Sequence, residues 1–157
     1  MAREEEHASD ILCGSHEATV DAKGRLKIPT AFRRFLDETY GADFFVTSIN
    51  DVQSVWVYPM PVWRDIAQKL AQAPTFDKSK RKALDQTTYW GQVARIDSEG
   101  RILIPAKLRE PAAMQGEVMV LGQVNHMDVW NHERLREHIK NQRLTDEDLE
   151  KLSNLGI

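Results

Sequence analysis

The feature that most constrains this sequence is an internal repeat. Residues 18–36 (ATVDAKGRLKIPTAFRRFL) match residues 94–112 (ARIDSEGRILIPAKLREPA) at an offset of 76 positions. The identical pairs are Ala18/Ala94, Asp21/Asp97, Gly24/Gly100, Arg25/Arg101, Ile28/Ile104, Pro29/Pro105 and Arg33/Arg109. A weaker match joins residues 55–58 to residues 127–130, so two copies of one unit make up nearly all of the chain. The fold must therefore accommodate two similar units.

The first part of each unit predicts a β-hairpin. In the first copy, residues 17–20 and 26–28 alternate polar with apolar side chains, which is the period of a half-buried strand. Between them, the Asp-Ala-Lys-Gly sequence of residues 21–24 suits a type I turn, with glycine in the left-handed position that follows.

The rest of each unit predicts a helix, two more strands and a second helix. Pro29 stands where a helix would begin, residues 44–58 contain two apolar strand segments, and another helix follows Pro61. Asp77 is placed to cap a further helix with a basic start. In the second copy, Pro111 should shorten the helix that corresponds to the one after Pro29.

The outer face of the first hairpin concentrates positive charge. Strand alternation points Arg25 and Lys27 outward, and Lys23 lies on the turn beside them. Asp21 and Arg25 flank the turn, so we expect the carboxylate to hold the guanidinium in one orientation. An arginine fixed in this way suits a phosphate or the major-groove edge of guanine.

The same residues also have a purely structural interpretation. Ion pairs at the surface are common, so Asp21–Arg25 and Asp97–Arg101 could do no more than lock two turns. A turn of this type needs aspartate and glycine but not arginine, yet both copies carry arginine at the same position. The repeat therefore favours a role in reading duplex DNA.

Four segments taken together resemble the MraZ family of bacterial transcriptional regulators, which is related to the AbrB-type DNA-binding proteins. They are DAKGR at residues 21–25, WVYP with Trp63 at residues 56–63, TFDK with Arg81 at residues 75–81, and DSEGRILIP at residues 97–105. The resemblance extends from about Leu12 to Ile139. It implies an α+β fold, a double-split β-barrel in which two internal repeats intertwine and helices lie at the periphery.

The resemblance implies one domain over residues 11–144, built from AbrB-like repeats at about residues 14–72 and 91–140. We expect residues 1–10 to form a disordered acidic tail, and residues 145–157 to form an acidic tail whose leucine spacing fits a helix. Each tail carries a net charge of −3 and the whole chain also carries −3, which leaves +3 on the segment between the tails. Whole-chain charge is therefore a poor guide to nucleic-acid binding here.

The resemblance further implies a sequence-specific transcriptional regulator that binds direct repeats in the promoter of the division and cell-wall gene cluster. The DNA-binding motif of the family corresponds to Asp21 with Arg25 and to Asp97 with Arg101. Members form ring-shaped homo-oligomers, so the expected partners are double-stranded DNA and further copies of the chain. The alternative is an antitoxin-like AbrB-type protein that pairs with a toxin.

The two hairpins differ in charge. Where the first has Lys23 and Lys27, the second has Glu99 and Leu103. A phosphate that approached the second hairpin would meet an acid and an apolar side chain. We therefore expect the first hairpin, with Arg25, to contact DNA, and the second to support the barrel or to pack against a neighbouring subunit.

Other classes of function lack the residues that they require. The histidines His126, His132 and His138 fit no metal-ligand spacing, and Cys13, the only cysteine, is expected to be a small buried residue. No nucleophile, acid–base pair or phosphate loop is evident, so we expect no enzymatic activity, catalytic residue, metal, cofactor or small-molecule substrate. No apolar run approaches the ~20 residues of a membrane helix. We expect a cytoplasmic protein, associated with the nucleoid and not with a membrane.

Overall fold

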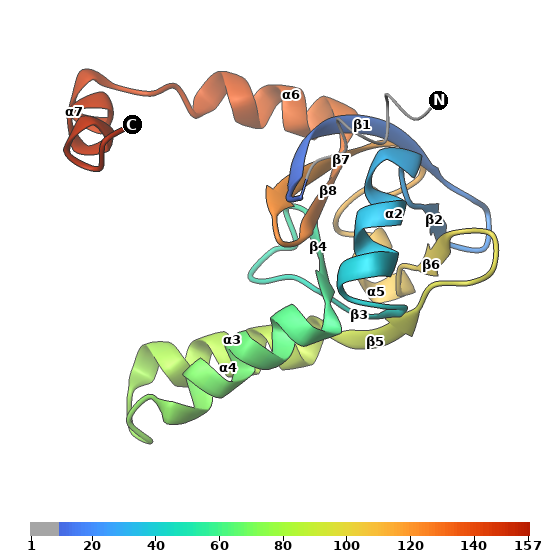
Figure 1. Ribbon diagram of the computed structural model, residues 1–157, viewed down its shortest axis with the longest axis horizontal. Coiled ribbons are helices and arrows are strands. Elements are labelled where there is room, and N and C mark those ends of the chain that lie inside the picture. Colours follow the sequence, from blue (N-terminus) through green and yellow to red (C-terminus); the bar gives the residue numbers. More distant parts are fainter. Residues whose placement is uncertain (1–9) are drawn as a thin grey trace.

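The computed structural model describes residues 10–157, which form an α+β fold (Figure 1). The strands are β1 (Leu12–Val20), β2 (Arg25–Lys27), β3 (Asp43–Thr47), β4 (Val55–Pro59), β5 (Gln92–Arg95), β6 (Arg101–Leu103), β7 (Gly116–Val124) and β8 (Met127–Asn131). The helices are α2 (Thr30–Thr39), α3 (Met60–Gln72), α4 (Lys78–Trp90), α5 (Ala106–Arg109), α6 (His132–Asn141) and α7 (Asp146–Asn154).

All eight described strands join one antiparallel sheet, in the order β5–β3–β4–β8–β7–β1–β2–β6. The two end strands, β5 and β6, also approach each other, so the sheet curls into a nearly closed barrel. Closure removes the exposed strand edges that an open sheet would present. The α+β barrel that the sequence predicts is therefore confirmed.

Strand pairing shows how the two repeats intertwine. Equivalent strands of the two copies pair with each other, β2 with β6 and β4 with β8. Two further pairings are crosswise, because β1 of the first copy pairs with β7 of the second, and β5 of the second pairs with β3 of the first. Each repeat thus supplies the strands that cover the edges of the other.

The core lies inside this barrel and confirms the predicted alternation. Leu26 and Ile28 are at most 1% exposed, as are their repeat equivalents Ile102 and Ile104. Leu36 of α2 belongs to the same buried cluster. Full burial of an aliphatic side chain of this size stabilises the fold by roughly 1.5–3 kcal/mol. The two β-hairpins that carry the charged turns are therefore anchored in the most buried part of the protein.

The helix boundaries follow the predicted signals. Helix α2 begins directly after Pro29, and Asp77 caps α4 by accepting a hydrogen bond from the backbone N–H of Lys80 at 2.8 Å. Helix α5 is only four residues long and ends two residues before Pro111. Proline has no N–H to donate to the carbonyl four residues earlier, so the run of helical hydrogen bonds is interrupted at Pro111 and the helix in the second copy is short.

Two helical segments project from the barrel (Figure 1). Helices α3 and α4 form an antiparallel hairpin on one side, and α6 leads to the separate C-terminal helix α7 on the other. Helix α7 begins with a capping box, in which Thr145 and Asp148 exchange hydrogen bonds. Within residues 10–157, no helix is long and apolar enough to cross a membrane.

One sequence expectation is wrong, and another lies mostly outside the described residues. Cys13 is exposed. It follows the buried Leu12 in β1, and adjacent residues of a strand face opposite sides. The expected disordered tail at residues 1–10 lies outside the described residues except for Asp10.

Candidate nucleic-acid interface

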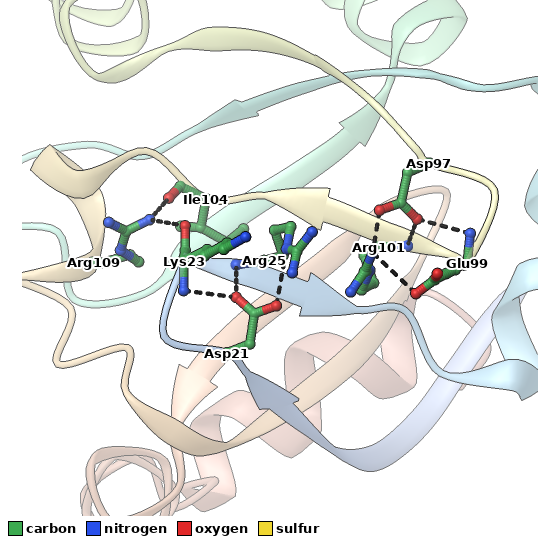
Figure 2. A network of polar contacts seen from close by, with 8 residues as sticks. All are labelled: Asp21, Lys23, Arg25, Asp97, Glu99, Arg101, Ile104 and Arg109. Atoms are coloured by element: carbon green, nitrogen blue, oxygen red, sulfur yellow. Dashed lines mark hydrogen bonds and ion pairs between the residues drawn. The ribbon is translucent and has the colours of Figure 1, made fainter.

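The first charged turn is organised around one carboxylate (Figure 2). Asp21 Oδ1 accepts hydrogen bonds from the backbone N–H groups of Lys23 and Arg25, both at 2.9 Å. Its other oxygen, Oδ2, accepts from Nε of Arg25 at 2.9 Å. Gly24 closes the turn with a φ of 87°, the left-handed conformation that glycine adopts without strain. The predicted Asp21–Arg25 pair is therefore present.

The second turn repeats this geometry with different residues. Asp97 Oδ1 accepts from the backbone N–H groups of Glu99 and Arg101 at 2.9 Å, and Oδ2 accepts from Arg101 Nε at 3.0 Å. Gly100 has a φ of 78°. The second turn adds one ion pair, because Arg101 Nη2 lies 3.0 Å from Glu99 Oε2.

Hydrogen bonding to the carboxylate lowers the pKa of the aspartate in both turns. The pKa of Asp21 lies below its usual value, chiefly because the carboxylate accepts the backbone N–H of Arg25. The pKa of Asp97 is lowered in the same way, chiefly by the backbone N–H of Arg101. Each carboxylate therefore stays ionised and keeps hold of its arginine throughout the neutral pH range.

The two turns meet along the paired strands β2 and β6, residues 25–27 and 101–103, which we term the β2–β6 ribbon. Arg25 lies opposite Leu103, and Lys27 lies opposite Arg101. Opposed side chains on one face of such a pair are about 5 Å apart at Cβ. The ribbon therefore brings three of the predicted cations, one of them from the second repeat, onto one short outward face.

The side chain of Arg25 is more exposed and makes fewer bonds than that of Arg101. Its side chain is 31% exposed, and among residues 10–157 the Asp21 carboxylate is the only group that its guanidinium bonds. The side chain of Arg101 is 24% exposed, and it bonds carboxylates at both Nε and Nη2. Both terminal nitrogens of Arg25 thus remain available to an external acceptor, whereas Arg101 has only one.

The other predicted cations lie in different surroundings. Lys23 is exposed on the turn, as the sequence predicts. Lys27 is also exposed, but its ammonium group donates to the backbone carbonyl of Glu99 in the second turn. The equivalent residue in the second repeat, Leu103, cannot make such a bond and is 42% exposed.

Two arginines that the sequence analysis did not single out brace the turns. Arg109 Nη1 donates to the carbonyls of Ile104 at 2.6 Å and Lys23 at 3.5 Å, while Arg33 Nη2 donates to Ser98 at 3.2 Å. A Cβ added at Gly24 would lie 1.4 Å from Arg109 Nη1. Each arginine comes from the helix of one repeat and packs on the turn of the other.

A signal for these bracing arginines was present in the sequence. Arg33 and Arg109 are one of the identical pairs of the repeat. Their helical position gave no reason to link them to a turn in the opposite copy.

Among the described residues, no group of three or more histidine, cysteine, aspartate or glutamate side chains is placed to hold a metal ion.

Comparison with known proteins links this arrangement to one family. The family model described as "MraZ protein, putative antitoxin-like" matches residues 11–86 and 92–152. A protein of Acidobacterium capsulatum is 41% identical over 144 residues, 92% of this chain and 98% of its own length. A protein of Koribacter versatilis is 39% identical over 145 residues, with coverage of 92% and 98%. One of a Thermoanaerobacter species is 36% identical over 149 residues, with coverage of 94% and 100%. All three are named "Transcriptional regulator MraZ".

Proposed function

The chain belongs to the MraZ family, and on that premise we propose that it is a sequence-specific regulator that reads promoter DNA with the β2–β6 ribbon. Its relatives are named transcriptional regulators, which is a DNA-directed and non-enzymatic function. The proposed operator consists of direct repeats in the promoter of the division and cell-wall gene cluster, bound chiefly through the first D-x-x-G-R hairpin.

The observation that carries this proposal is that Arg25 is held at one nitrogen and has two terminal nitrogens without a partner among the described residues. Its Nε is held by Asp21 at 2.9 Å, so the side chain loses little conformational freedom when it binds. The two terminal nitrogens form the planar fork that pairs with O6 and N7 of guanine or with a phosphate. A surface arginine used only to lock a turn has no need to present that fork outward.

The surroundings of Arg25 suit a duplex. A two-stranded ribbon fits the major groove, and Arg25 and Lys23 stand at its exposed first turn. Lys27 and Arg101 add positive charge at the opposite end of the strand pair. This charge supports phosphate contacts, which orient the ribbon, while Arg25 provides the base contact that distinguishes sequences.

One ribbon contacts too few bases to select a single promoter. Linked copies increase the effective concentration of each further ribbon at adjacent repeats without any new chemistry. We therefore include self-assembly into a closed homo-oligomer in the proposal. Direct repeats suit such an assembly, since successive subunits can each engage one repeat.

The test is binding to DNA upstream of the gene that encodes the chain, measured by electrophoretic shift or fluorescence anisotropy. We expect affinity to fall with a log–log salt slope of about −0.9 for each phosphate contact. Arg25→Ala should cost about 1–3 kcal/mol of binding free energy per engaged subunit. Arg136→Ala, which removes an exposed arginine on α6, is the matched control and should bind as the parent does. Affinity that is independent of salt, or equal in the two variants, contradicts the proposal.

A further inference from the structure

A broad acidic cleft lies away from the β2–β6 ribbon. It has a volume of about 1300 Å³ and is bounded by α6, β8 and the loop between β3 and β4. Its lining carries four acids, Asp51, Asp128, Glu133 and Glu137, against one arginine, Arg134. We term it the α6 cleft. The cleft exceeds the roughly 300–1000 Å³ of small-molecule sites, which favours a protein segment as its occupant.

The floor of the α6 cleft is aromatic and contains a carboxylate that lacks a donor. The rings of Trp130 and His138 stack with centroids 4.5 Å apart. Asp128 Oδ2 accepts from Trp130 Nε1 at 2.9 Å, but Oδ1 is buried and has no hydrogen-bond partner within residues 10–157. Burial raises the pKa of Asp128. The nearby Ser54 side chain opposes this shift to a smaller degree, yet its hydroxyl does not satisfy Oδ1. The floor therefore combines an aromatic surface with a buried carboxylate that has one unsatisfied oxygen.

The chain itself carries a segment with the complementary chemistry. The turn between α3 and α4 and the first residues of α4, residues 74–82, form what we term the hairpin tip. It has a net charge of +3, from Lys78, Lys80, Arg81 and Lys82 against Asp77. At its end Phe76 is 88% exposed, more than any other large apolar residue among those described. An exposed phenylalanine flanked by cations matches an acidic cleft with an aromatic floor.

The hairpin tip cannot enter the α6 cleft of its own chain. Helix α4 touches the rim of that cleft at its other end, where Gln86 Oε1 accepts the backbone N–H of Asn50 at 2.8 Å. Lys78 lies eight residues earlier in the same helix, about 12 Å away along its axis. The α3–α4 hairpin points outward from the barrel, as Figure 1 shows. The tip is therefore presented to another molecule.

We propose that the hairpin tip of one copy docks in the α6 cleft of a second copy, with Phe76 against the aromatic floor and the basic residues against the acidic rim. The proposal rests on the self-assembly included in the proposed function and names the surfaces that form it. Tip and cleft are different surfaces of one chain, so the contact is head-to-tail. Repetition of such a contact closes into a ring when the rotation between copies allows it.

Two variants that each remove one half of the contact test the proposal. The tip variant carries Phe76→Ala and Arg81→Glu. The cleft variant carries Glu133→Lys and Glu137→Lys. All four positions are exposed, so both chains should fold. Sizes are measured without DNA, by gel filtration with light scattering. We expect each variant alone to be an 18.0 kDa monomer, unlike the parent. An equimolar mixture should form a two-chain complex, because the intact tip of one chain fits the intact cleft of the other.

Several outcomes would overturn the proposal. A monomeric parent, a variant that keeps the size of the parent, or a folded mixture that stays monomeric would each contradict it. Helix α7 exposes Leu149 and offers a second apolar surface through which copies could meet. Leu149→Glu is the control for that contact, and it should keep the size of the parent. Assembly that fails in this α7 variant but survives in the tip variant would assign the contact to α7. Arg25→Ala should assemble normally, so failure of assembly and failure of DNA reading remain distinguishable.

Discussion

Arg25 and Arg101 occupy equivalent positions in two turns whose hydrogen bonds to the aspartate carboxylate agree to within about 0.1 Å, yet their charges are compensated to different degrees. Arg25 faces one carboxylate, and no residue that the structure describes bonds its two terminal nitrogens. Arg101 faces two, because the second repeat has Glu99 where the first has Lys23. The comparison teaches that a duplicated turn preserves geometry through aspartate and glycine, while the residue between them sets the charge that a ligand meets.

The largest expected difference between the hairpins is in DNA binding. Arg25→Ala should weaken operator binding by about 1–3 kcal/mol per engaged subunit, or roughly 5- to 150-fold. Arg101→Ala should weaken it less, because one of its terminal nitrogens already pairs with Glu99. Binding isotherms of both variants at one salt concentration measure the difference. An equal loss, or a greater loss for Arg101→Ala, would show that the two hairpins contact DNA alike.

The second comparison concerns the stability of the turns. Gly24→Ala and Gly100→Ala each force a Cβ into a left-handed conformation, which costs about 1–2 kcal/mol of unfolding free energy. Both would also press on a bracing arginine, because the new Cβ would lie 1.4 Å from Arg109 Nη1 at Gly24 and 2.5 Å from Arg33 Nη1 at Gly100. Gly24→Ala should cost about 1 kcal/mol more, because the closer approach displaces Arg109 from the Ile104 carbonyl, its shorter hydrogen bond. Urea denaturation measures both. A larger effect at Gly100 would contradict the assigned bracing roles of the two arginines.

A smaller effect should follow from removing the extra acid of the second turn. Glu99→Gln removes the charge that pairs with Arg101 Nη2 and leaves at most a neutral hydrogen bond, so the guanidinium becomes more available to an external acceptor. Exposed ion pairs contribute about 0.2–1 kcal/mol, so operator affinity should rise by at most about fivefold. In the matched variant Lys23→Gln, affinity should fall instead. A fall in both variants would mean that Glu99 does not restrain Arg101.

The smallest expected difference between the turns is in their response to acid. Both Asp21 and Asp97 have a pKa below the ordinary 3.8, through their backbone hydrogen bonds. A lowered pKa in the folded state stabilises the fold above the unfolded value, and that stabilisation is lost as pH falls through the folded value. The free energy of unfolding should therefore decrease below about pH 3.8. Asp21→Asn and Asp97→Asn should reduce this dependence equally, as urea denaturation at each pH would measure. Unequal reductions would contradict the equivalence of the two turns.

The sequence by itself determined the local structure of this protein. The alternation that places Leu26 and Ile28 inward, the cap at Asp77 and the helix end before Pro111 all appear where predicted. The Asp21–Arg25 pair was equally predictable, because its two residues are four positions apart across one tight turn. Turn chemistry, capping and strand period act over a few residues, so the local sequence contains all of the interacting groups.

Only the tertiary structure decided which residues of different repeats meet. The sequence predicted that Lys27 faces outward, and only the structure shows that its ammonium donates to the backbone carbonyl of Glu99, 72 positions away, because β2 pairs with β6. The bracing of one turn by Arg33 and of the other by Arg109 joins residues 65 to 86 positions apart. Period-2 alternation states which face of a strand is buried but not which strand lies beside it. Closure of the barrel sets that pairing, because burying both repeats in one core leaves each turn beside the helix of the other copy.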